Sequence, residues 1–348
     1  HCFNLFLYKY KYLMTLQERI NTISELGLYL RKNFLEDHFD TIKLATAKNP
    51  WFTVKSITNA VLSISDMVEK DMLSAWLNPY TIKEPSAPKN VLIIMAGNIP
   101  LVGFHDLLSV IIMGHNPVIK LSSNDNVLMP LIINIFLDLS PSNYNQIKFI
   151  NEVKGRSFDA VIATGTDNSA NYFKYYFKDA KRIIRKNRRS IAILDGSENS
   201  QQIKGLANDI FLYYGLGCRN VSKIYLPVGY DLNILFKSFY LHKHVIEHKK
   251  YGNNYDYNKA IYLMGNNKLI ENGFILLKED SSLYSPVAML YYEYYNDIND
   301  VHSFIDKNSD KIQCIVSKNN IPFGNTQKPK LWDYADGVDI IDFLKEMS

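Results

Sequence analysis

Residues 91–121, VLIIMAGNIPLVGFHDLLSVIIMGHNPVIKL, decide the fold class. Val91–Met95 is a short apolar run, and the turn residues of Ala96–Pro100 come after it, which indicates a buried strand and a loop. Leu101–Met113 is predicted as a helix and Pro117–Leu121 as a second strand. A strand, a helix and a strand in this order predict a parallel sheet of the α/β class.

The same alternation continues toward the C-terminus. Before Tyr80 the chain is predicted to be helical, because apolar residues recur at three- and four-residue spacing. Further helices are expected near 126–139, after Asn168 and over 203–214. Strands are expected near 147, 159–163, 191–194, 224–227, 260–264, 273–277, 288–292 and 312–316. Helices that interleave with this many strands predict an α/β protein with two sheets.

Length and charge limit the classes of function. The chain has 348 residues, enough for about two domains, and a formal net charge of only +4. No basic run is long enough to indicate nucleic-acid binding. Polar residues such as His105 and Asp106 interrupt the apolar stretch 91–114, so no integral membrane segment is expected. The densest basic cluster is interpreted as a solvated edge, or else as a contact with an anionic ligand; it comprises Arg182, Arg185, Lys186, Arg188 and Arg189.

The spacing of the cysteines indicates the cellular compartment. Cys2, Cys218 and Cys314 are widely spaced and form neither a disulfide pattern nor a metal pattern. A reducing cytoplasm is therefore expected.

Residues 1–13 differ in character from the helical pattern that begins at Met14. They are interpreted as a non-native or disordered leader, with Met14 as the native start.

Cys218 is the first candidate for chemistry. It lies in the run YYGLGCRN, residues 213–220, directly before the strand-like segment Ser222–Leu226. A thiol in a loop bordered by glycines, where backbone can approach a bound carbonyl group, has the setting of a nucleophile. A small buried core residue explains the local sequence equally well, because free cysteine is often buried.

Three further segments come directly after predicted strands. Asn98 could donate its amide to a developing oxyanion or could simply cap the loop. Lys120 ends a strand where part of a dinucleotide could lie, although such a lysine is usually only solvated. In residues 162–169, IATGTDNS, a strand enters a glycine turn and then a helix whose N-terminal amides could face phosphate. An ordinary helix cap is the alternative there.

In this order the segments resemble the aldehyde dehydrogenase superfamily, and more closely its acyl-CoA reductase (LuxC-like) branch. The resemblance covers the chain from about Trp51 to its end and rests on the ordered set MAGNIPLVGFHDLLSVIIMGHNPVIKLSSND, DAVIATGTDNSANYF, IIRKNRRSIAILDG, YYGLGCRNVSK, PFGNTQ and DYADGVD. It implies a Rossmann-type parallel-sheet cofactor domain, residues 14–195 with the N-terminal helices. A catalytic α/β domain carrying Cys218 is implied for residues 196–330. Residues 331–348 are then expected to return to the cofactor domain or to form an oligomer contact.

The resemblance also implies roles for individual residues. Cys218 matches the catalytic nucleophile, and its own backbone N–H would share an oxyanion hole with the amide of Asn98. Lys120 matches the lysine that holds the adenosine ribose. Gly165 and Thr166 match the turn beside the pyrophosphate. The cofactor-binding residues expected on this basis are Lys120, Ser122, Ser123, Thr164, Gly165 and Thr166, and no metal is expected.

Two departures from the superfamily pattern refine this expectation. The glutamate that activates water in aldehyde-oxidising members has no counterpart in the stretch Arg185-Lys186-Asn187. Without that base an acyl-enzyme should survive long enough to be reduced. An acidic residue expected shortly after the ribose lysine is replaced near Ser123, which favours NADPH, with NADH possible because Asp125 is close by in the sequence.

The expected function is the NAD(P)H-dependent reduction of a fatty acyl thioester, such as acyl-CoA, to the aldehyde through an acyl-cysteine. Aldehyde oxidation with NAD(P) and a non-catalytic acyl-binding scaffold in a lipid-synthesis complex are the alternatives. A homo-oligomer is expected, with acyl-transfer enzymes as further partners. His105 is interpreted as structural. His242, His244 and His248 are interpreted as a solvated face, because they lack the glutamate of a zinc HExxH motif.

Overall fold

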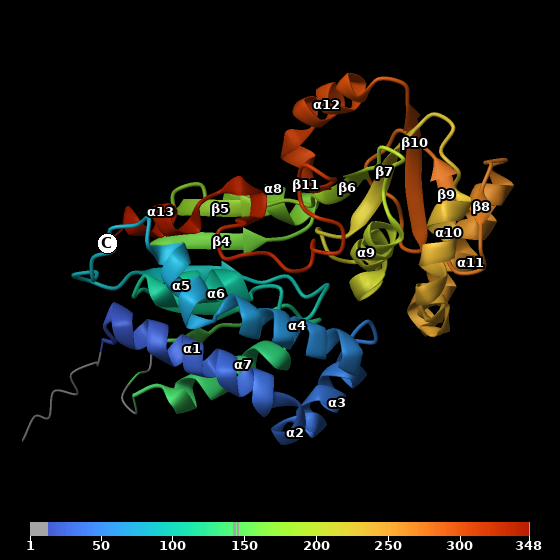
Figure 1. Ribbon diagram of the computed structural model, residues 1–348. Helices are drawn as coiled ribbons and strands as arrows, with labels where there is room; N and C mark the ends of the chain where they lie inside the picture. Colours follow the sequence, from blue (N-terminus) through green and yellow to red (C-terminus); the bar gives the residue numbers. More distant parts are fainter. Residues whose placement is uncertain (1–12, 142–143, 145, 348) are drawn as a thin grey trace, which may run out of the picture. The chain divides into compact units, whose positions relative to one another are not determined.

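The computed structural model describes residues 13–141, 144 and 146–347 (Figure 1). It confirms the predicted α/β class with two sheets. Apart from Leu13, the predicted leader lies outside the described residues.

The chain divides into two compact units, and each is described by itself. Unit 1 comprises the residues up to Ala45, Thr58–Ile184 and the residues from Val338 onwards. Unit 2 comprises Thr46–Ile57 and Arg185–Gly337.

Helices precede the first sheet, as the apolar spacing predicts. In α1 (Leu16–Lys32), Thr15 and Glu18 form a reciprocal capping box that fixes the start of the helix. Its buried face, which includes Ile23, Leu26 and Leu30, packs on helices of unit 1. The other helices of this region are α2 (Phe34–Asp37), α3 (Phe39–Lys48), α4 (Val54–Met67) and α5 (Lys70–Leu77).

The first sheet has the order β3-β2-β1-β4-β5, and β1 to β4 run parallel. Its strands are β1 (Asn90–Ile94), β2 (Asn116–Lys120), β3 (Lys148–Phe149), β4 (Ala160–Thr164) and β5 (Lys181–Arg185). Helices α6 (Phe104–Ile112), α7 (Leu128–Leu139) and α8 (Asp167–Tyr176) connect successive strands or follow them. The predicted strand–helix–strand unit is confirmed: β1, α6 and β2 form it, and both strands are almost wholly buried.

The C-terminal residues belong to unit 1. Asp339 caps α13 (Ile340–Lys345) and accepts a hydrogen bond from the hydroxyl group of Tyr80 at 2.5 Å. Lys181 donates to the carbonyl of Phe343 at 2.7 Å, so this short helix is bound to the end of the sheet at β5.

The second sheet has the order β11-β6-β7-β10-β9-β8, and only the β8–β9 pair is antiparallel. Its strands are β6 (Arg189–Ile193), β7 (Val221–Pro227), β8 (Ile270–Glu271), β9 (Leu276–Glu279), β10 (Met289–Tyr295) and β11 (Ile312–Val316). The helical segments within residues 185–337 are α9 (Ser200–Phe211), η1 (Leu212–Gly215), α10 (Asn233–Phe239), η2 (Tyr240–Glu247), α11 (Lys249–Met264), α12 (Ile298–Lys307), η3 (Ser309–Lys311) and η4 (Ala335–Gly337).

One predicted strand is wrong. Residues 260–264 form the last turn of α11. The helix buries Tyr251, Tyr255 and Asn258, which lie on one face at helical spacing, while Met264 is 81% exposed. The apolar run therefore marks an exposed helix end, and a short apolar run cannot distinguish a strand from a helix.

Candidate functional site

In unit 1, the carboxyl ends of β1, β2 and β4 meet at one edge of the sheet. The register pairs Ile94 with Lys120 on one side and with Ala163 on the other. The strand order changes direction between β1 and β4, and ligands of open α/β sheets bind at such a switch point. This edge brings together three segments from the sequence prediction: the loop of Asn98, the end of β2 at Lys120, and the turn at Gly165.

The loop of Asn98 packs closely against the loop that comes after β2. A Cβ atom added to Gly97 would lie 2.6 Å from Ser122 Oγ and 3.0 Å from the backbone nitrogen of Asp125, so no side chain fits there. Asn98 itself is exposed. The two loops thus form one compact wall at the switch point.

Asp125 holds this wall in place, a role that the sequence does not reveal. The carboxylate accepts a hydrogen bond from the backbone N–H of Leu101 at 2.9 Å. Leu101 has φ of 58°, a left-handed conformation that a leucine adopts only when its surroundings impose it. Asp125 is only 6% exposed, and this burial raises the pKa of its carboxyl group to about 6.

The turn after β4 has the features of a phosphate-binding helix start. Gly165 lies so close to α8 that an added Cβ would come within 2.8 Å of the Cβ of Ser169. Thr166 is the N-cap of α8 and accepts a hydrogen bond from the backbone N–H of Ser169 at 3.4 Å. Free amides at the start of a helix favour an anion, so this edge, with half-buried Lys120, fits a nicotinamide dinucleotide.

In unit 2, a strained turn leads into Cys218. After α9 the chain passes through three consecutive left-handed residues: Tyr213 with φ of 53°, Tyr214 with φ of 58° and Gly215 with φ of 74°. Left-handed conformations cost a tyrosine about 1–2 kcal/mol. Such strain persists only where neighbouring groups hold the chain, and it is concentrated at functional sites.

Asn220 is the residue that holds this turn. Its side-chain amide donates to the carbonyls of Asp209 at 3.0 Å and Leu212 at 2.7 Å, while its oxygen accepts the N–H of Gly217 at 2.9 Å. These bonds tie the start of β7 to the end of α9. Asn220 was not among the predicted site residues, although an asparagine two residues after a loop cysteine was the available signal.

Cys218 is half-buried, and the charges around its thiol oppose one another. Burial raises the pKa of the thiol, whereas the positive charges of Arg219, Arg189 and Arg185 lower it and the carboxylate of Asp336 raises it. Burial is the largest of these effects, so the pKa of the Cys218 thiol is raised overall, although three arginines oppose the rise.

The interpretation of the basic cluster as a solvated edge is correct for some members and wrong for others. Arg182 and Lys186 are exposed. Arg185, however, is only 7% exposed, and Arg188 pairs with Asp336 at 3.2 Å. The error arises because charge density along the chain does not reveal which face of a strand a side chain occupies.

The prediction that His242, His244 and His248 form a solvated face is wrong for two of the three. His242 stacks on Phe211 at 5.1 Å, and burial lowers its pKa to about 4. His248 caps α11 and stacks on Trp51 at 5.2 Å, so only His244 is fully exposed. Within the described ranges, no group of three or more His, Cys, Asp or Glu side chains could hold a metal ion.

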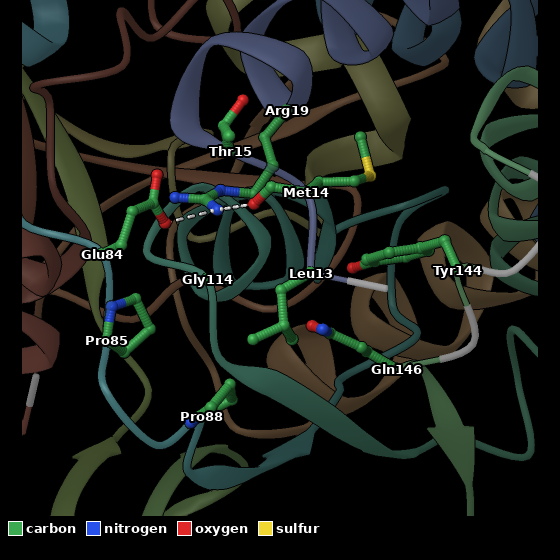
Figure 2. A pocket seen from close by; sticks show the side chains of 10 residues that line it. All are labelled: Leu13, Met14, Thr15, Arg19, Glu84, Pro85, Pro88, Gly114, Tyr144 and Gln146. Atoms are coloured by element: carbon green, nitrogen blue, oxygen red, sulfur yellow. Dashed lines mark hydrogen bonds and ion pairs between the residues drawn. The ribbon is translucent and has the colours of Figure 1, made fainter. Parts of the chain in front are cut away.

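Figure 2 shows a cavity of about 90 Å³ in unit 1 that none of the predicted site residues lines. Buried Arg19 crosses it, donating to the carbonyl of Ile112 at 2.9 Å and to the carboxylate of Glu84 at 2.9 Å. Its other lining residues include Pro85, Pro88, Tyr144 and Gln146. These bonds join α1 to the segment before β1 and to α6, so we interpret the cavity as part of the packing of this helix.

The candidate residues therefore form two groups. Asn98, Lys120 and the Gly165 turn lie in unit 1, and Cys218 with its arginines lies in unit 2. No helix in the described part of the chain is both long and apolar enough to cross a membrane.

Comparisons with known proteins agree with the fold. The sequence profile of the acyl-CoA reductase (LuxC) family matches residues 38–234. Long-chain acyl-protein thioester reductase 2 of Photobacterium leiognathi is 25% identical over 198 residues, which are 50% of this chain and 40% of that protein. Long-chain acyl-protein thioester reductase of Aliivibrio fischeri is 21% identical over 282 residues, 71% of this chain and 58% of that protein. The chain thus spans about half the length of these relatives.

Among solved structures, the aldehyde dehydrogenase of Mycobacterium tuberculosis complexed with NAD+ superimposes with a TM-score of 0.64 at 12% identity. The superposition covers 88% of this chain and 74% of that one. This likeness confirms the predicted aldehyde-dehydrogenase-like fold.

Proposed function

Because this chain belongs to the acyl-CoA reductase (LuxC) family, we propose that it reduces a fatty acyl thioester to the aldehyde through an acyl group held on Cys218. The observation that carries the proposal is the setting of Cys218: a half-buried thiol among arginines, after a strained turn that Asn220 anchors. A cysteine that only fills the core would need neither a strained turn before it nor arginines around it. The two relatives named above are both called thioester reductases, which agrees with this choice.

In the proposed reaction the sulfur of Cys218 attacks the carbonyl carbon of the thioester. The backbone N–H of Cys218 stabilises the oxyanion, a role that the resemblance to the superfamily also implies for the amide of Asn98, and the thiol part of the donor leaves. A nicotinamide dinucleotide, if held by the residues named below, would supply the hydride, and Cys218 would carry the resulting thiohemiacetal. Breaking the carbon–sulfur bond then releases the aldehyde and regenerates Cys218.

The surroundings of the thiol favour reduction over hydrolysis. The Arg185-Lys186-Asn187 stretch has no carboxylate to activate water. Asp336, whose charge acts on Cys218, is in an ion pair with Arg188 at 3.2 Å. A carboxylate held by an arginine is a weak base, so water attack on the acyl group should be slow.

For the cofactor we propose NADPH, with NADH as the alternative. Lys120, Ser122 and Ser123 would hold the adenosine side, and Thr164, Gly165 and Thr166 the pyrophosphate. The replacement of an acidic residue near Ser123 supports NADPH, and Asp125, close by in the sequence, keeps NADH as the alternative.

The test is acylation of the protein followed by mass spectrometry. After incubation with a long-chain acyl-CoA, we expect one acyl group on Cys218 that NADPH removes as aldehyde. Cys218→Ala should show no adduct and no turnover while remaining folded, and Cys314→Ala, the matched control, should keep both.

Three outcomes would contradict the proposal. Normal turnover by Cys218→Ala would exclude the cysteine mechanism. No adduct with any chain length would favour the acyl-binding scaffold, and an adduct formed only from aldehyde and NADP+ would favour aldehyde oxidation. The homo-oligomer, the acyl-transfer partners and the cytoplasmic location stay predictions.

A further inference from the structure

The hydroxyl group of Ser190 binds the backbone of Cys218. Ser190 is the second residue of β6 and is fully buried. Its Oγ donates a hydrogen bond to the carbonyl oxygen of Cys218 at 2.9 Å. The pairing of β6 with β7, which begins at Val221, brings the two residues together, although they lie 28 positions apart in the sequence. The carbonyl group on the C-terminal side of Cys218 is therefore held by the neighbouring strand.

The peptide on the N-terminal side of Cys218 is held by Asn220. The backbone N–H of Asn220 donates to the carbonyl of Gly217 at 3.1 Å, and its side chain accepts the N–H of Gly217 at 2.9 Å. In a planar trans peptide the C=O and the N–H point in opposite directions. The N–H of Cys218 shares its peptide with the carbonyl of Gly217, so it points away from Asn220. Within the described part of the chain, no hydrogen bond uses this N–H.

The two peptide planes that flank Cys218 are thus both held by hydrogen bonds, one through Gly217 and the other through Ser190. Only the φ and ψ angles between these planes are soft, so the backbone conformation of Cys218 is fixed as well. The direction of its N–H, relative to the side chain of the same residue, follows from that conformation.

We propose that Ser190 is a positioning residue, which keeps the N–H of Cys218 aimed at the thioester oxygen during acylation. This inference rests on the proposed role of Cys218 as nucleophile. As the new carbon–sulfur bond forms, the π electron pair of the thioester carbonyl moves onto its oxygen, and the N–H donates to that oxyanion. The carbonyl then forms again as the donor's sulfur leaves with its electron pair as a thiolate. A donor that is needed only while the oxyanion exists affects the rate of this step and of no step without an oxyanion.

Ser222 provides the matched control. It is also buried, at 8% exposure, and its Oγ donates to the carbonyl of Leu283 at 2.7 Å and more weakly to that of Ser190 at 3.4 Å. Neither bond involves Cys218. Loss of either hydroxyl leaves a buried carbonyl without a donor, so the two serines have a similar structural role and differ in their contact with the cysteine.

The experiment compares two reactions of the same sulfur. The first is acylation of Cys218 by a long-chain acyl-CoA without cofactor, and the second is its alkylation by iodoacetamide; both rates are followed on the Cys218 peptide by mass spectrometry. Alkylation displaces iodide from a CH₂ carbon and forms no oxyanion. In Ser190→Ala we expect acylation to slow about tenfold, less than the loss of a whole oxyanion donor, while alkylation stays within about twofold of the wild type. Ser222→Ala should keep both rates within about twofold.

A folded Ser190→Ala variant that is acylated at the wild-type rate would overturn the inference, and so would a fall of acylation and alkylation by the same factor. If the alanine variant does not fold by circular dichroism, Ser190→Thr and Ser190→Val replace it. These two side chains have nearly the same shape, and only threonine keeps the hydroxyl. The threonine variant should then be acylated about tenfold faster than the valine variant, and equal rates would remove the role of Ser190.

The two proposals fail separately. An acyl adduct in the wild type together with an unchanged acylation rate in Ser190→Ala removes only the role of Ser190. A wild type that is alkylated at Cys218 but forms no acyl adduct removes the acyl-transfer function, and the role of Ser190 with it.

Discussion

Among single residues, Asp125 shows how a buried charge can fix a loop at a cost in stability. Its carboxylate secures the left-handed Leu101 and so shapes the loop of Asn98. Burial raises the pKa of Asp125 to about 6, above its ordinary value near 4. The folded protein therefore prefers the protonated form, and the free energy of unfolding should fall as the pH rises from about 4 to about 6.

Asp125→Asn should remove this dependence. An asparagine oxygen can still accept the N–H of Leu101, but the side chain no longer charges. We expect the variant to gain up to about 3 kcal/mol relative to the wild type across this pH window and to keep that gain at higher pH. Urea unfolding from pH 4 to pH 8 measures it, with exposed Asp256→Asn as the control; parallel curves for wild type and Asp125→Asn would disprove the pKa assignment.

At the level of elements, the turn between α9 and β7 depends on long-range bonding more than on local preference. The tyrosines at 213 and 214 are unfavourable in left-handed conformations, and only the glycine at 215 suits one. Asn220 offsets that strain with its bonds to Asp209, Leu212 and Gly217. The loop geometry is thus a property of the α9–β7 pair.

Asn220→Ala should therefore lower the free energy of unfolding by about 3 kcal/mol, because buried carbonyls lose their donors. It should also make the segment around Cys218 more sensitive to limited proteolysis. Asn254→Ala, which loses a single bond to the carbonyl of Lys250 within α11, should cost less than about 1 kcal/mol. Equal stabilities of the two variants would mean that other groups hold the turn.

At the level of the whole molecule, the residues of the proposed reaction are distributed over the two units. The residues proposed for cofactor binding lie in unit 1, and the thiol with its arginines lies in unit 2. Acylation of Cys218 should therefore be separable from cofactor binding.

Lys120→Met tests this division. We expect its Kd for NADPH to rise about tenfold or more, because a charge-assisted contact is lost. Its rate of acylation by acyl-CoA without cofactor should equal that of the wild type. Lys148→Met, which changes an exposed lysine on β3 of the same sheet, should leave both quantities unchanged; unaltered NADPH binding by Lys120→Met would remove Lys120 from the cofactor site.

Particular residues show how far the sequence alone reaches. The strands β1, β2 and β4 and the helices after them could be predicted, because apolar period and turn residues are local signals. The turn at Gly165 and the loop of Cys218 could also be predicted, because their glycines are local signals of a turn. The helical end of α11 could not be predicted from the sequence. Which of its residues are buried, such as Tyr255, depends on packing partners far away in the sequence.

By itself, the sequence determined the α/β class and the chemical types at the candidate positions, since covalent order and local conformational preference set both. Only the tertiary structure decided what surrounds them. The pairing of β6 with β7 brings the hydroxyl of Ser190 to the backbone carbonyl of Cys218, and a buried hydrogen bond holds Asp125 against Leu101. The reason is physical: the burial and the charge environment of a side chain depend on segments far away in the sequence, and no local pattern records them.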